Sequence, residues 1–450
     1  MGNAADLSPS VNTGMLDPEA SAVQKFKWRM IPLLAVCYFV YRLDLLNVGF
    51  AGLTMRKDLD LSASAFGFGV GVFYWGFFLC QVPSNLMLEK VGARRWLPII
   101  MLAWSVLSGC MALVNSQHSF YIMRFILGGA DAGFFPGVIY YIGCWSPAAH
   151  RGRMIGMFNI GGLIAPILGG PIAVNILRLD GVLGIEGWRW LFICEAIPAV
   201  ILTVVLAAMV VDRPAKARWL TPAERDALQA ALDAEARKRA ALGTYTLRQA
   251  VTNPRIIALC FTYLGILGSM SAFSFFLPIM FQQLGLSNQQ IGLASAIPYV
   301  VACIALMLVT RHSDLKGERI YHVAVSILIA CVGILLAGWW SHDATLLIVA
   351  ICIAIAGGQS ALAVFWSLPA TFLSGAAAAA SVALINAVGN LGGYFGPQIM
   401  GLFRDWTGDF SLGITVMAGW SILAAVLVVA LGRSPGMKAT LDSARAGTAK

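Results

Sequence analysis

Long apolar segments recur along this chain from end to end, and they constrain its fold more than any other feature. A helix needs about 20 predominantly apolar residues to cross the hydrocarbon core of a membrane. A window of that length predicts twelve transmembrane helices, at residues 30–52, 65–88, 96–115, 119–142, 153–177, 189–211, 256–283, 289–310, 320–340, 344–367, 379–403 and 410–432. We therefore expect an all-α, polytopic membrane protein.

The composition supports a membrane environment. Of the 450 residues, 59% are hydrophobic and 12% are charged, whereas soluble domains carry about 25% charged residues. The nine cysteines form no CxxC pair and the five histidines lack metal-ligand spacing, so we expect no metal and no disulfide. No phosphate-binding loop of the GxxxxGKS or GxxxxGKT type occurs, which argues against an ATP-driven pump. No constellation of catalytic residues points to an enzyme.

One long polar connection divides the chain. Within this connection, Thr221-Pro222-Ala223-Glu224 has the pattern of an N-cap followed by proline and glutamate in the first turn of a helix. We therefore predict that an amphipathic surface helix starts there. The predicted order is a cytosolic tail (1–29), a six-helix bundle (30–211), a cytoplasmic linker (212–255), a second six-helix bundle (256–432) and a cytosolic tail (433–450).

Lysine and arginine are distributed unevenly between the two sides of the membrane. Most of them fall in the two tails, the linker and the loops on the same side, and few, such as Arg56 and Lys57, lie on the other side. The positive-inside rule then predicts a multi-pass protein of the inner (cytoplasmic) membrane with both termini in the cytoplasm. The net charge of +9 follows from this bias, so we expect lipid contacts and no nucleic-acid partner.

Two short motifs occur once in each half of the chain. Residues 89–94 read EKVGAR and residues 314–319 read DLKGER, while residues 159–166 read NIGGLIAP and residues 390–397 read NLGGYFGP. Both pairs are separated by nearly the same number of residues and keep their direction. This pattern indicates a parallel duplication, whose halves pack about an axis along the membrane normal with the substrate between them.

The first motif places a carboxylate at the end of a span and an arginine in the following turn. The pairs are Glu89 with Arg94 and Asp314 with Arg319. We predict a conformational clasp that forms in one state of the protein and breaks in the other. The alternative is that the basic residues only anchor the loops in the cytoplasm.

Ionisable residues inside the predicted spans are few: Arg42, Asp44, Arg124, Asp131 and Glu195. A charge within a membrane is costly and usually faces a cavity or a partner. Asp44 and Asp131 are therefore candidates for proton coupling, and Arg124 lies two helical turns from Asp131 on the same face. The alternative for each acid is a structural ion pair.

Uncharged polar and aromatic residues complete the candidate site. Asn159, Asn390 and Ser367 could hydrogen-bond a solute, or they could hold helices together. Phe77 and Trp366 could line an aromatic pocket, or they could simply pack.

Stretches in both halves then become recognisable: LDLLNVGFAGLTMRKDL, QVPSNLMLEKVGARRW, RFILGGADAGFFPGVIYY, GWRWLFICEAIP and HSDLKGERIYH. Together they resemble the anion:cation symporter family of the major facilitator superfamily, whose members carry tartrate, phthalate, hydroxyphenylacetate and sugar acids. The resemblance covers roughly residues 30–410. It implies proton-coupled symport by alternating access, with the acids at Asp44 and Asp131 and the arginine at Arg124. The late polar pair would be Asn390 with either Ser367 or Ser374.

The chain departs from the family pattern in its first span. Where the family writes a tyrosine and, three residues later, an arginine, this chain has Arg42 and Leu45. Residues three apart lie on neighbouring parts of one helix face, so we hypothesise that Arg42 supplies the displaced positive charge. Phe77 also stands where a tyrosine is common.

These observations predict a secondary transporter that takes up a small organic anion, such as tartrate, another dicarboxylate or an aromatic acid. Arg42 and Arg124 would hold the anion through charge-assisted hydrogen bonds, and protons would be the only coupling ion, without another cofactor. We expect a monomer. The alternatives are a proton-driven exporter of drugs or metabolites and a non-transporting anion sensor.

Overall fold

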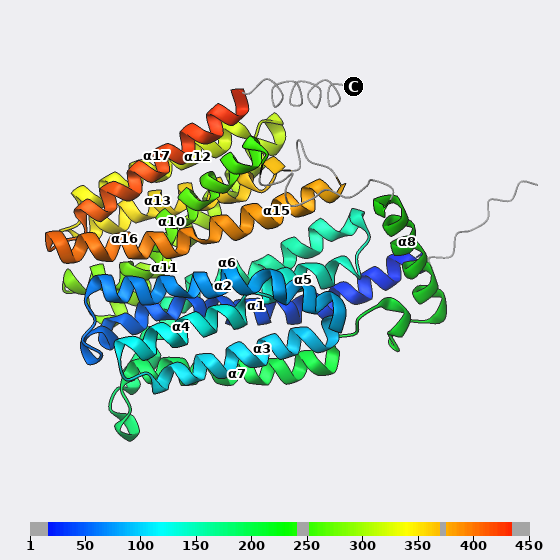
Figure 1. Ribbon diagram of the computed structural model, residues 1–450, viewed down its shortest axis with the longest axis horizontal. Coiled ribbons are helices and arrows are strands. Elements are labelled where there is room, and N and C mark those ends of the chain that lie inside the picture. Colours follow the sequence, from blue (N-terminus) through cyan, green and yellow to red (C-terminus); the bar gives the residue numbers. More distant parts are fainter. Residues whose placement is uncertain (1–16, 241–251, 370–374, 434–450) are drawn as a thin grey trace, which may run out of the picture.

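The computed structural model describes residues 17–240, 252–369 and 375–433, and no strand occurs within these ranges. The first bundle contains α1 (Pro18–Asp58), α2 (Ala63–Val91), α3 (Ala93–Cys110), α4 (Gln117–Asp131), α5 (Phe134–Gly143), α6 (Ala148–Ile176) and α7 (Gly187–Met209). The second contains α10 (Pro254–Gln283), α11 (Asn288–Lys316), α12 (Ile320–Trp339), α13 (Ala344–Phe365), α15 (Gly375–Asn390), α16 (Gly392–Thr407) and α17 (Ser411–Arg433). The all-α fold predicted from the sequence is confirmed (Figure 1).

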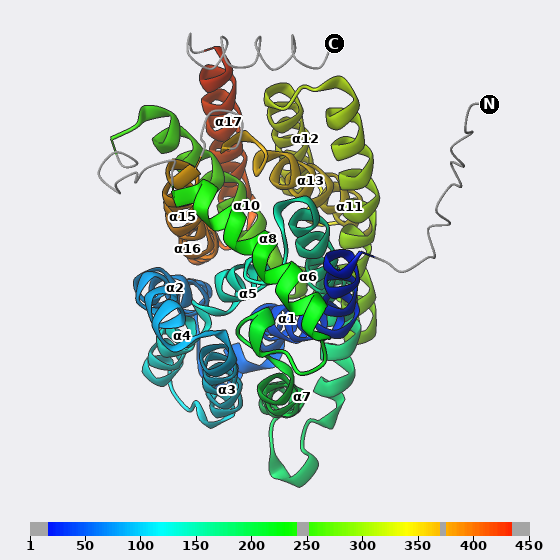
Figure 2. The same cartoon turned by 90° about the vertical axis from the view of Figure 1, so that its right-hand side faces the viewer.

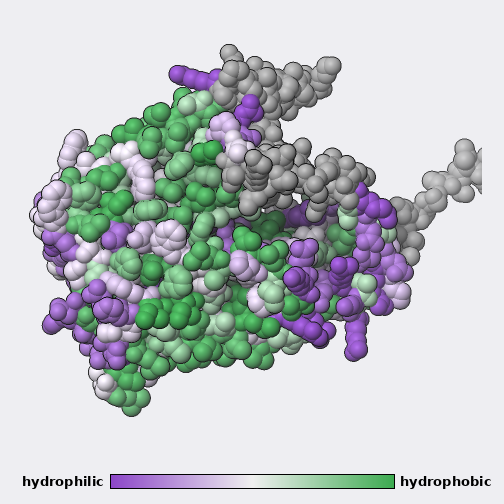
Figure 3. All heavy atoms as spheres, viewed as in Figure 1, coloured by the Kyte–Doolittle hydropathy of each residue, from purple (hydrophilic) through white to green (hydrophobic). Residues whose placement is uncertain are grey.

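The helices match the predicted spans in number and order. Among the described residues, eleven segments are long and apolar enough to cross a membrane, with α4 and α5 together forming one of them. The consecutive helices α15 and α16 take the place of the predicted span at 379–403. Figure 3 shows that apolar side chains cover the flanks of both bundles. Val204 on α7 and Leu308 on α11 are 67% and 64% exposed, as expected where lipid replaces water.

The first helix is longer than its apolar core requires. It begins at Pro18, capped by the side chain of Asp17, so residues 18–29, which we expected in the N-terminal tail, are helical. This extension packs beside α8 (Pro222–Ala240), the helix of the linker. Glu224 on α8 accepts hydrogen bonds from Ser21 at 2.6 Å and Lys25 at 2.9 Å, which holds the extension in a helical conformation.

The linker helix is fixed to the first bundle. Besides its contact with α1, α8 places Glu235 2.8 Å from Arg151 and 3.0 Å from the backbone nitrogen of Ala148, both on α6. Figure 2 shows α8 crossing the end of the first bundle beside α1. The expected capping geometry is present, because the Glu224 amide donates to the Thr221 hydroxyl and the Thr221 amide donates to the Glu224 carboxylate.

The two repeated motifs have equivalent structural roles in both halves. In the first motif, Gly92 and Gly317 end α2 and α11 with φ angles of 89° and 60°, a region that strongly favours glycine. In the second, Gly161 and Gly392 let neighbouring backbones approach. A Cβ atom on either would lie 2.0 Å from the carbonyl oxygen of Ala35 or 2.4 Å from that of Leu264.

The bundles meet closely at the end of the molecule opposite α8. There, the carboxylate of Asp405 on α16 accepts hydrogen bonds from the amides of Ala63 and Ser64 at the start of α2, at 2.9 and 2.8 Å. Gln282 on α10 donates to the carbonyl of Leu53 on α1 at 3.2 Å. Among the hydrogen bonds of the described residues, those that join the bundles all lie at this end. At the α8 end, the space-filling view is hollowed between the bundles (Figure 3).

Candidate functional site

Four charged side chains lie inside the first bundle, and we call them the charge cluster. Asp44 on α1, Arg124 and Asp131 on α4, and Glu195 on α7 are 3%, 1%, 1% and 5% exposed. Such burial is costly for an unpaired charge. The cluster therefore has to balance its charges internally or hold protons.

Arg124 is the cation of the charge cluster. Its guanidinium lies 4.7 Å from the centre of the Phe73 ring, and one of its nitrogens donates to the carbonyl of Val70 at 3.4 Å. Both Asp44 and Asp131 lie within electrostatic range of it. The structure thus places Arg124 among the acids and beneath an aromatic ring, where it is inaccessible to a solute in this conformation.

Asp44 and Asp131 have different partners. The hydroxyl of Ser108 on α3 donates a hydrogen bond to Asp44, and Arg124 lies within electrostatic range of Asp44. Asp131 lies beside Tyr41 and within electrostatic range of Asp44, Arg124 and Arg42, but one of its carboxylate oxygens is buried without a hydrogen-bond partner. Asp131 is therefore the acid that senses both Arg124 and Arg42.

Glu195 is a further acid that the sequence analysis noted within a span but did not assign to the site. Both of its carboxylate oxygens are buried without a hydrogen-bond partner, and Asp44 lies within electrostatic range. The amide group of Asn47, one turn from Asp44 on α1, is likewise buried without a partner. The sequence feature that could have identified Glu195 as part of the charge cluster is an acidic residue inside an apolar segment, which is the feature that identified Asp44.

Arg42 lies within electrostatic range of tyrosines from both bundles. The hydroxyls of Tyr38 on α1, Tyr74 on α2 and Tyr299 on α11 lie within electrostatic range of its guanidinium. Tyr263 on α10 lies within range of Arg42, Tyr38 and Tyr74. We call these five residues the aromatic site. Arg42 is only partly buried, as are Tyr38, Tyr74 and Tyr299, so part of the aromatic site is accessible.

Two of the predicted aromatic residues occupy different places. Trp366 packs edge-on against Tyr263 with the ring centres 5.0 Å apart, so it borders the aromatic site. Phe77 is 8% exposed and packs on Phe73, the ring that covers Arg124. Phe77 thus belongs to the surroundings of the charge cluster.

The predicted uncharged polar residues Asn159, Asn390 and Ser367 are all partly buried, and Ser374 lies outside the described residues. The side-chain amide of Asn390 donates to the carbonyl of Asn386 at 2.8 Å, and the hydroxyl of Ser367 donates to the carbonyl of Val364 at 2.7 Å. Both bonds stay close to the residue's own helix and leave the oxygen atoms available as acceptors. Asn159 lies on α6, next to Phe158, whose ring packs on Tyr38 at 4.7 Å. Their roles toward a solute stay predictions.

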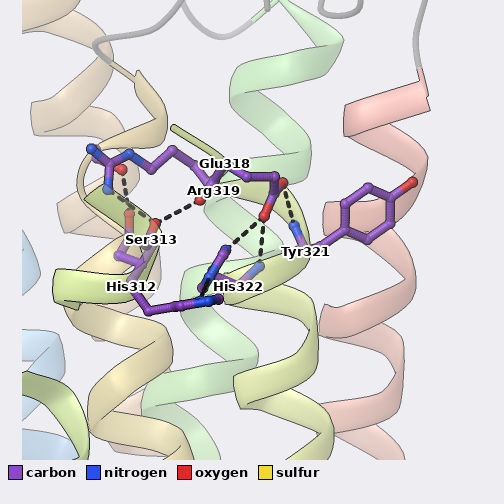
Figure 4. A network of polar contacts seen from close by, with 8 residues as sticks. His312, Ser313, Glu318, Arg319, Tyr321 and His322 are labelled. Carbon is purple, nitrogen blue, oxygen red and sulfur yellow. Dashed lines mark hydrogen bonds and ion pairs between the residues drawn. The ribbon is translucent and has the colours of Figure 1, made fainter. Parts of the chain in front are cut away.

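The predicted clasp has an ion pair in one half of the chain. Arg319 binds Asp314 at 2.6 Å and donates to Ser313 at 2.9 Å, in the turn between α11 and α12. Figure 4 shows this turn with Glu318, which accepts hydrogen bonds from the backbone of Tyr321 and His322, and with His312 against His322. In the other half, the described residues include no Glu89–Arg94 ion pair. The backbone nitrogen of Arg94 instead donates to Asp212 at 2.8 Å, because α3 begins there and offers its free amides.

No group of three or more His, Cys, Asp or Glu side chains is placed to hold a metal ion in the described part of the chain. Two six-helix bundles with buried charges in one of them, and a partly accessible arginine between them, define the architecture of a membrane carrier. The family profile of the Major Facilitator Superfamily matches residues 34–280 and 259–449. The chain belongs to this superfamily.

Curated relatives include transporters that are named for tartrate, for quinolone resistance and for metabolite transport. A protein of Agrobacterium vitis that is named a tartrate transporter is 40% identical over 418 residues, which is 93% of each chain. A quinolone resistance transporter of Acinetobacter baumannii is 38% identical, over 89% of this chain and 92% of its own. The metabolite transport protein NicT of Pseudomonas putida is 39% identical, over 90% and 93%.

Solved structures support the fold. A bacterial homologue of the human lysosomal transporter Spinster superposes with a TM-score of 0.74 at 15% identity, covering 91% of this chain and 97% of the other. A D-xylose-proton symporter superposes with a TM-score of 0.69 at 18% identity, covering 90% and 97%. At these identities the likeness extends to the fold alone.

Proposed function

We propose that the chain is a proton-coupled symporter that takes up a small organic anion across the cytoplasmic membrane. The observation that carries this proposal is that Asp131, buried with one oxygen unpartnered, lies within electrostatic range of Arg42 as well as of Arg124, and that Tyr41 and Tyr74 lie within range of both Arg42 and Asp131. An anion on Arg42 and a proton on Asp131 can therefore influence each other directly. Such mutual influence is what coupling requires.

The sign of this influence favours symport. While Asp131 is ionised, its negative charge competes with an anion for the field of Arg42. A proton on Asp131 removes that competition, and a bound anion in turn favours the protonated acid. The two ligands therefore bind cooperatively, and loss of the proton weakens the hold on the anion.

The state of the bundles suggests the side on which release occurs. The excess of positive loop residues at the α8 end predicts that this end faces the cytoplasm. The contacts of Asp405 and Gln282 close the opposite end. The described conformation therefore corresponds to an inward-facing carrier, from which the anion and the proton leave into the cell.

The role of each predicted residue follows from this scheme. Arg42 would bind the anion by charge-assisted hydrogen bonds, Asp131 would carry the coupling proton, and Asp44 would exchange protons with it across Arg124. Membrane lipid would cover the flanks, and a monomer would suffice because both bundles lie in one chain.

Export is the second candidate, since the relative from Acinetobacter baumannii is named a quinolone resistance transporter. Direction separates the two functions. In proteoliposomes, a symporter accumulates its anion when the outside is made acidic, whereas a proton-driven exporter in the same orientation gives accumulation only when the lumen is acidic.

Transport into proteoliposomes tests the proposal, with a panel of organic acids offered with and without an inward proton gradient. We expect about tenfold stimulation of uptake by the gradient for at least one acid. Asp131→Asn should lose this stimulation and retain exchange of labelled for unlabelled anion, because exchange needs no net proton movement. Asp233→Asn on α8 is the matched control. Uptake that ignores the gradient for every acid would contradict symport.

A further inference from the structure

We infer that the aromatic site takes a planar aromatic monocarboxylate, and that it discriminates against dicarboxylates such as tartrate. This inference rests on the proposed function and names the substrate class of that same site. It is carried by two independent features: the number of accessible cations, and the nature of the walls around them.

The first feature is that, of the two described arginines inside the membrane-spanning segments, only Arg42 is partly accessible. Arg42 is partly accessible, while Arg124 is 1% exposed, lies against Phe73 and is within electrostatic range of both aspartates of the charge cluster. In the second bundle, lysine and arginine lie toward the helix ends, at Arg255, Arg311, Lys316, Arg319, Arg404 and Arg433.

One accessible cation can neutralise one carboxylate. An anion with a second carboxylate would have to bury that charge without a partner, which is strongly unfavourable in a region of low dielectric constant. The Asp131 carboxylate, within range of Arg42, adds a repulsive charge whenever it is ionised. The charge balance therefore favours a monoanion.

The second feature is that the walls around Arg42 are aromatic on both sides. Tyr38 and Tyr74 belong to the first bundle, and Tyr263 and Tyr299 belong to the second. Trp366 extends the aromatic surface by its edge-on contact with Tyr263. A flat ring between these side chains gains stacked or edge-to-face contacts, whereas a polyhydroxylated chain would bring its hydroxyl groups against ring faces and lose hydration.

Glycines hold three of these rings in place. A Cβ atom would lie 2.3 Å from the Tyr38 ring if added at Gly162, 2.3 Å from the Tyr74 ring if added at Gly393, and 1.9 Å from the Tyr263 ring if added at Gly389. Each ring thus lies directly against a helix backbone. Walls fixed in this way are organised before the ligand binds, which reduces the entropy lost on binding.

The duplicated NxGG motif supplies two of these glycines, Gly162 and Gly393. In each half the first glycine of the pair permits the helix crossing and the second receives a tyrosine ring. The sequence repeat therefore positions two tyrosines of one site, Tyr38 against α6 and Tyr74 against α16.

The Tyr299 hydroxyl already shares a hydrogen bond of 2.9 Å with Ser274. Because a hydroxyl can both donate and accept, the tyrosine hydroxyls in range of Arg42 keep capacity to bind a polar substituent on the ring of the ligand.

The test is proton-gradient-driven uptake into proteoliposomes of four labelled acids: 4-hydroxybenzoate, phthalate, L-tartrate and lactate. 4-Hydroxybenzoate and phthalate are aromatic acids with one and two carboxylates, and lactate and L-tartrate are the aliphatic acids with one and two. We expect uptake of 4-hydroxybenzoate to exceed that of each of the others by about tenfold or more at equal concentration. Tartrate or phthalate uptake equal to that of 4-hydroxybenzoate overturns the inference, and equal lactate uptake refutes the aromatic preference.

The outcome also separates this inference from the proposed function. Gradient-stimulated uptake of tartrate alone would leave symport intact and refute the aromatic monocarboxylate. No gradient-stimulated uptake of any acid would contradict symport itself.

A variant pair tests the wall directly. Tyr263→Leu removes one ring, so the preference for 4-hydroxybenzoate over lactate should fall by about tenfold. Tyr263→Phe keeps the ring and should retain the preference. Tyr140→Leu, at an exposed position on α5, is the control. An unchanged preference in Tyr263→Leu, in protein whose melting temperature matches the control, overturns the role of the ring.

Discussion

In the first bundle the buried polar groups of the membrane interior include three carboxylates and a guanidinium, whereas in the described part of the second bundle they are all hydroxyls of serine and threonine. The two bundles nevertheless share their helix order and both sequence motifs. Duplication has kept the glycines that set the helix crossings and has let the polar interior diverge. In the proposed function, the first bundle would hold the charges on which protons and anions act, and the second would supply an uncharged wall.

The two bundles also differ in how their buried polar groups are hydrogen-bonded. In the second bundle, Ser269 and Ser421 bond to each other at 3.0 Å and to carbonyls of their own helices. In the first, Asn47, Asp131 and Glu195 keep buried polar atoms without partners.

The second bundle also has buried oxygens without a partner, for example on Ser360 and Gln398, but among the described residues the unpartnered carboxylate oxygens all belong to the first bundle. Carboxylates are the costliest of these groups to leave unpartnered, so the first bundle carries the larger polar cost.

Removal of the accessible cation should have the largest effect. Arg42→Gln removes the group that pairs with the anion in the proposed function, so we expect kcat/KM for uptake to fall about 100-fold, equivalent to ~3 kcal/mol. Arg42→Lys should recover part of the loss, because it keeps the charge without the planar fork. Ser360→Ala is the control from the second bundle, a buried hydroxyl, and should change uptake by less than about twofold. Comparable losses of uptake in Arg42→Gln and Ser360→Ala would contradict the claim that the first bundle, and not the second, holds the charge on which transport depends.

The shared packing of the two bundles predicts a matched loss of stability. Gly161→Ala and Gly392→Ala each force a Cβ atom against a backbone carbonyl, at 2.0 and 2.4 Å. We expect each to destabilise the protein by about 1–3 kcal/mol, seen as a lower melting temperature in detergent.

Both substitutions have controls in their own bundles. A Cβ atom at Gly156 or Gly419 would meet nothing within 4 Å, so Gly156→Ala and Gly419→Ala should melt like the unmodified protein. If Gly161→Ala is destabilising and Gly392→Ala is not, the motif has lost its structural role in the second bundle.

The contact of the linker helix α8 with α1, which involves only the first bundle, should have a smaller effect on stability. Burial would raise the pKa of Glu224, but hydrogen bonds from Lys25, Ser21 and the Thr221 amide lower it from 4.5 to about 2. The ionised carboxylate therefore stabilises the contact of α8 with α1 at any pH above 4.5. This contribution is lost as the pH falls from 4.5 through about 2.

Glu224→Gln should accordingly lower the stability at pH 7 by about 1 kcal/mol, and its difference from the unmodified protein should shrink on acidification below pH 4.5. Melting temperatures in detergent at several pH values check this. Asp226→Asn, an exposed position on the same helix, is the control. A difference that grows on acidification would contradict the assigned contact.

The sequence was sufficient for the helix order, the duplication and the positions of Asp44, Arg124 and Asp131, because long apolar segments and charges within them are local signals. The aromatic site was not predictable. Tyrosines are common in membrane helices, and Tyr38, Tyr74, Tyr263 and Tyr299 come together only when four helices pack. The role of Arg94 was also hidden, since its amide binds Asp212, which is distant in the chain.

Substitution of Glu195 should have the smallest effect on uptake. It tests whether the residues that gain and lose protons include α7. An ionised carboxylate with both oxygens buried and unpartnered, and with Asp44 in range, would be too costly to persist. We therefore expect Glu195 to stay neutral through the transport cycle, so that Glu195→Gln, similar in shape, changes gradient-driven uptake by less than about twofold. Asp44→Asn, on the neighbouring helix α1, should lower uptake about tenfold, because in the proposed function Asp44 exchanges protons with Asp131. An equal loss in Glu195→Gln, with an altered pH profile, would make Glu195 part of the proton path and extend the titrating region to α7.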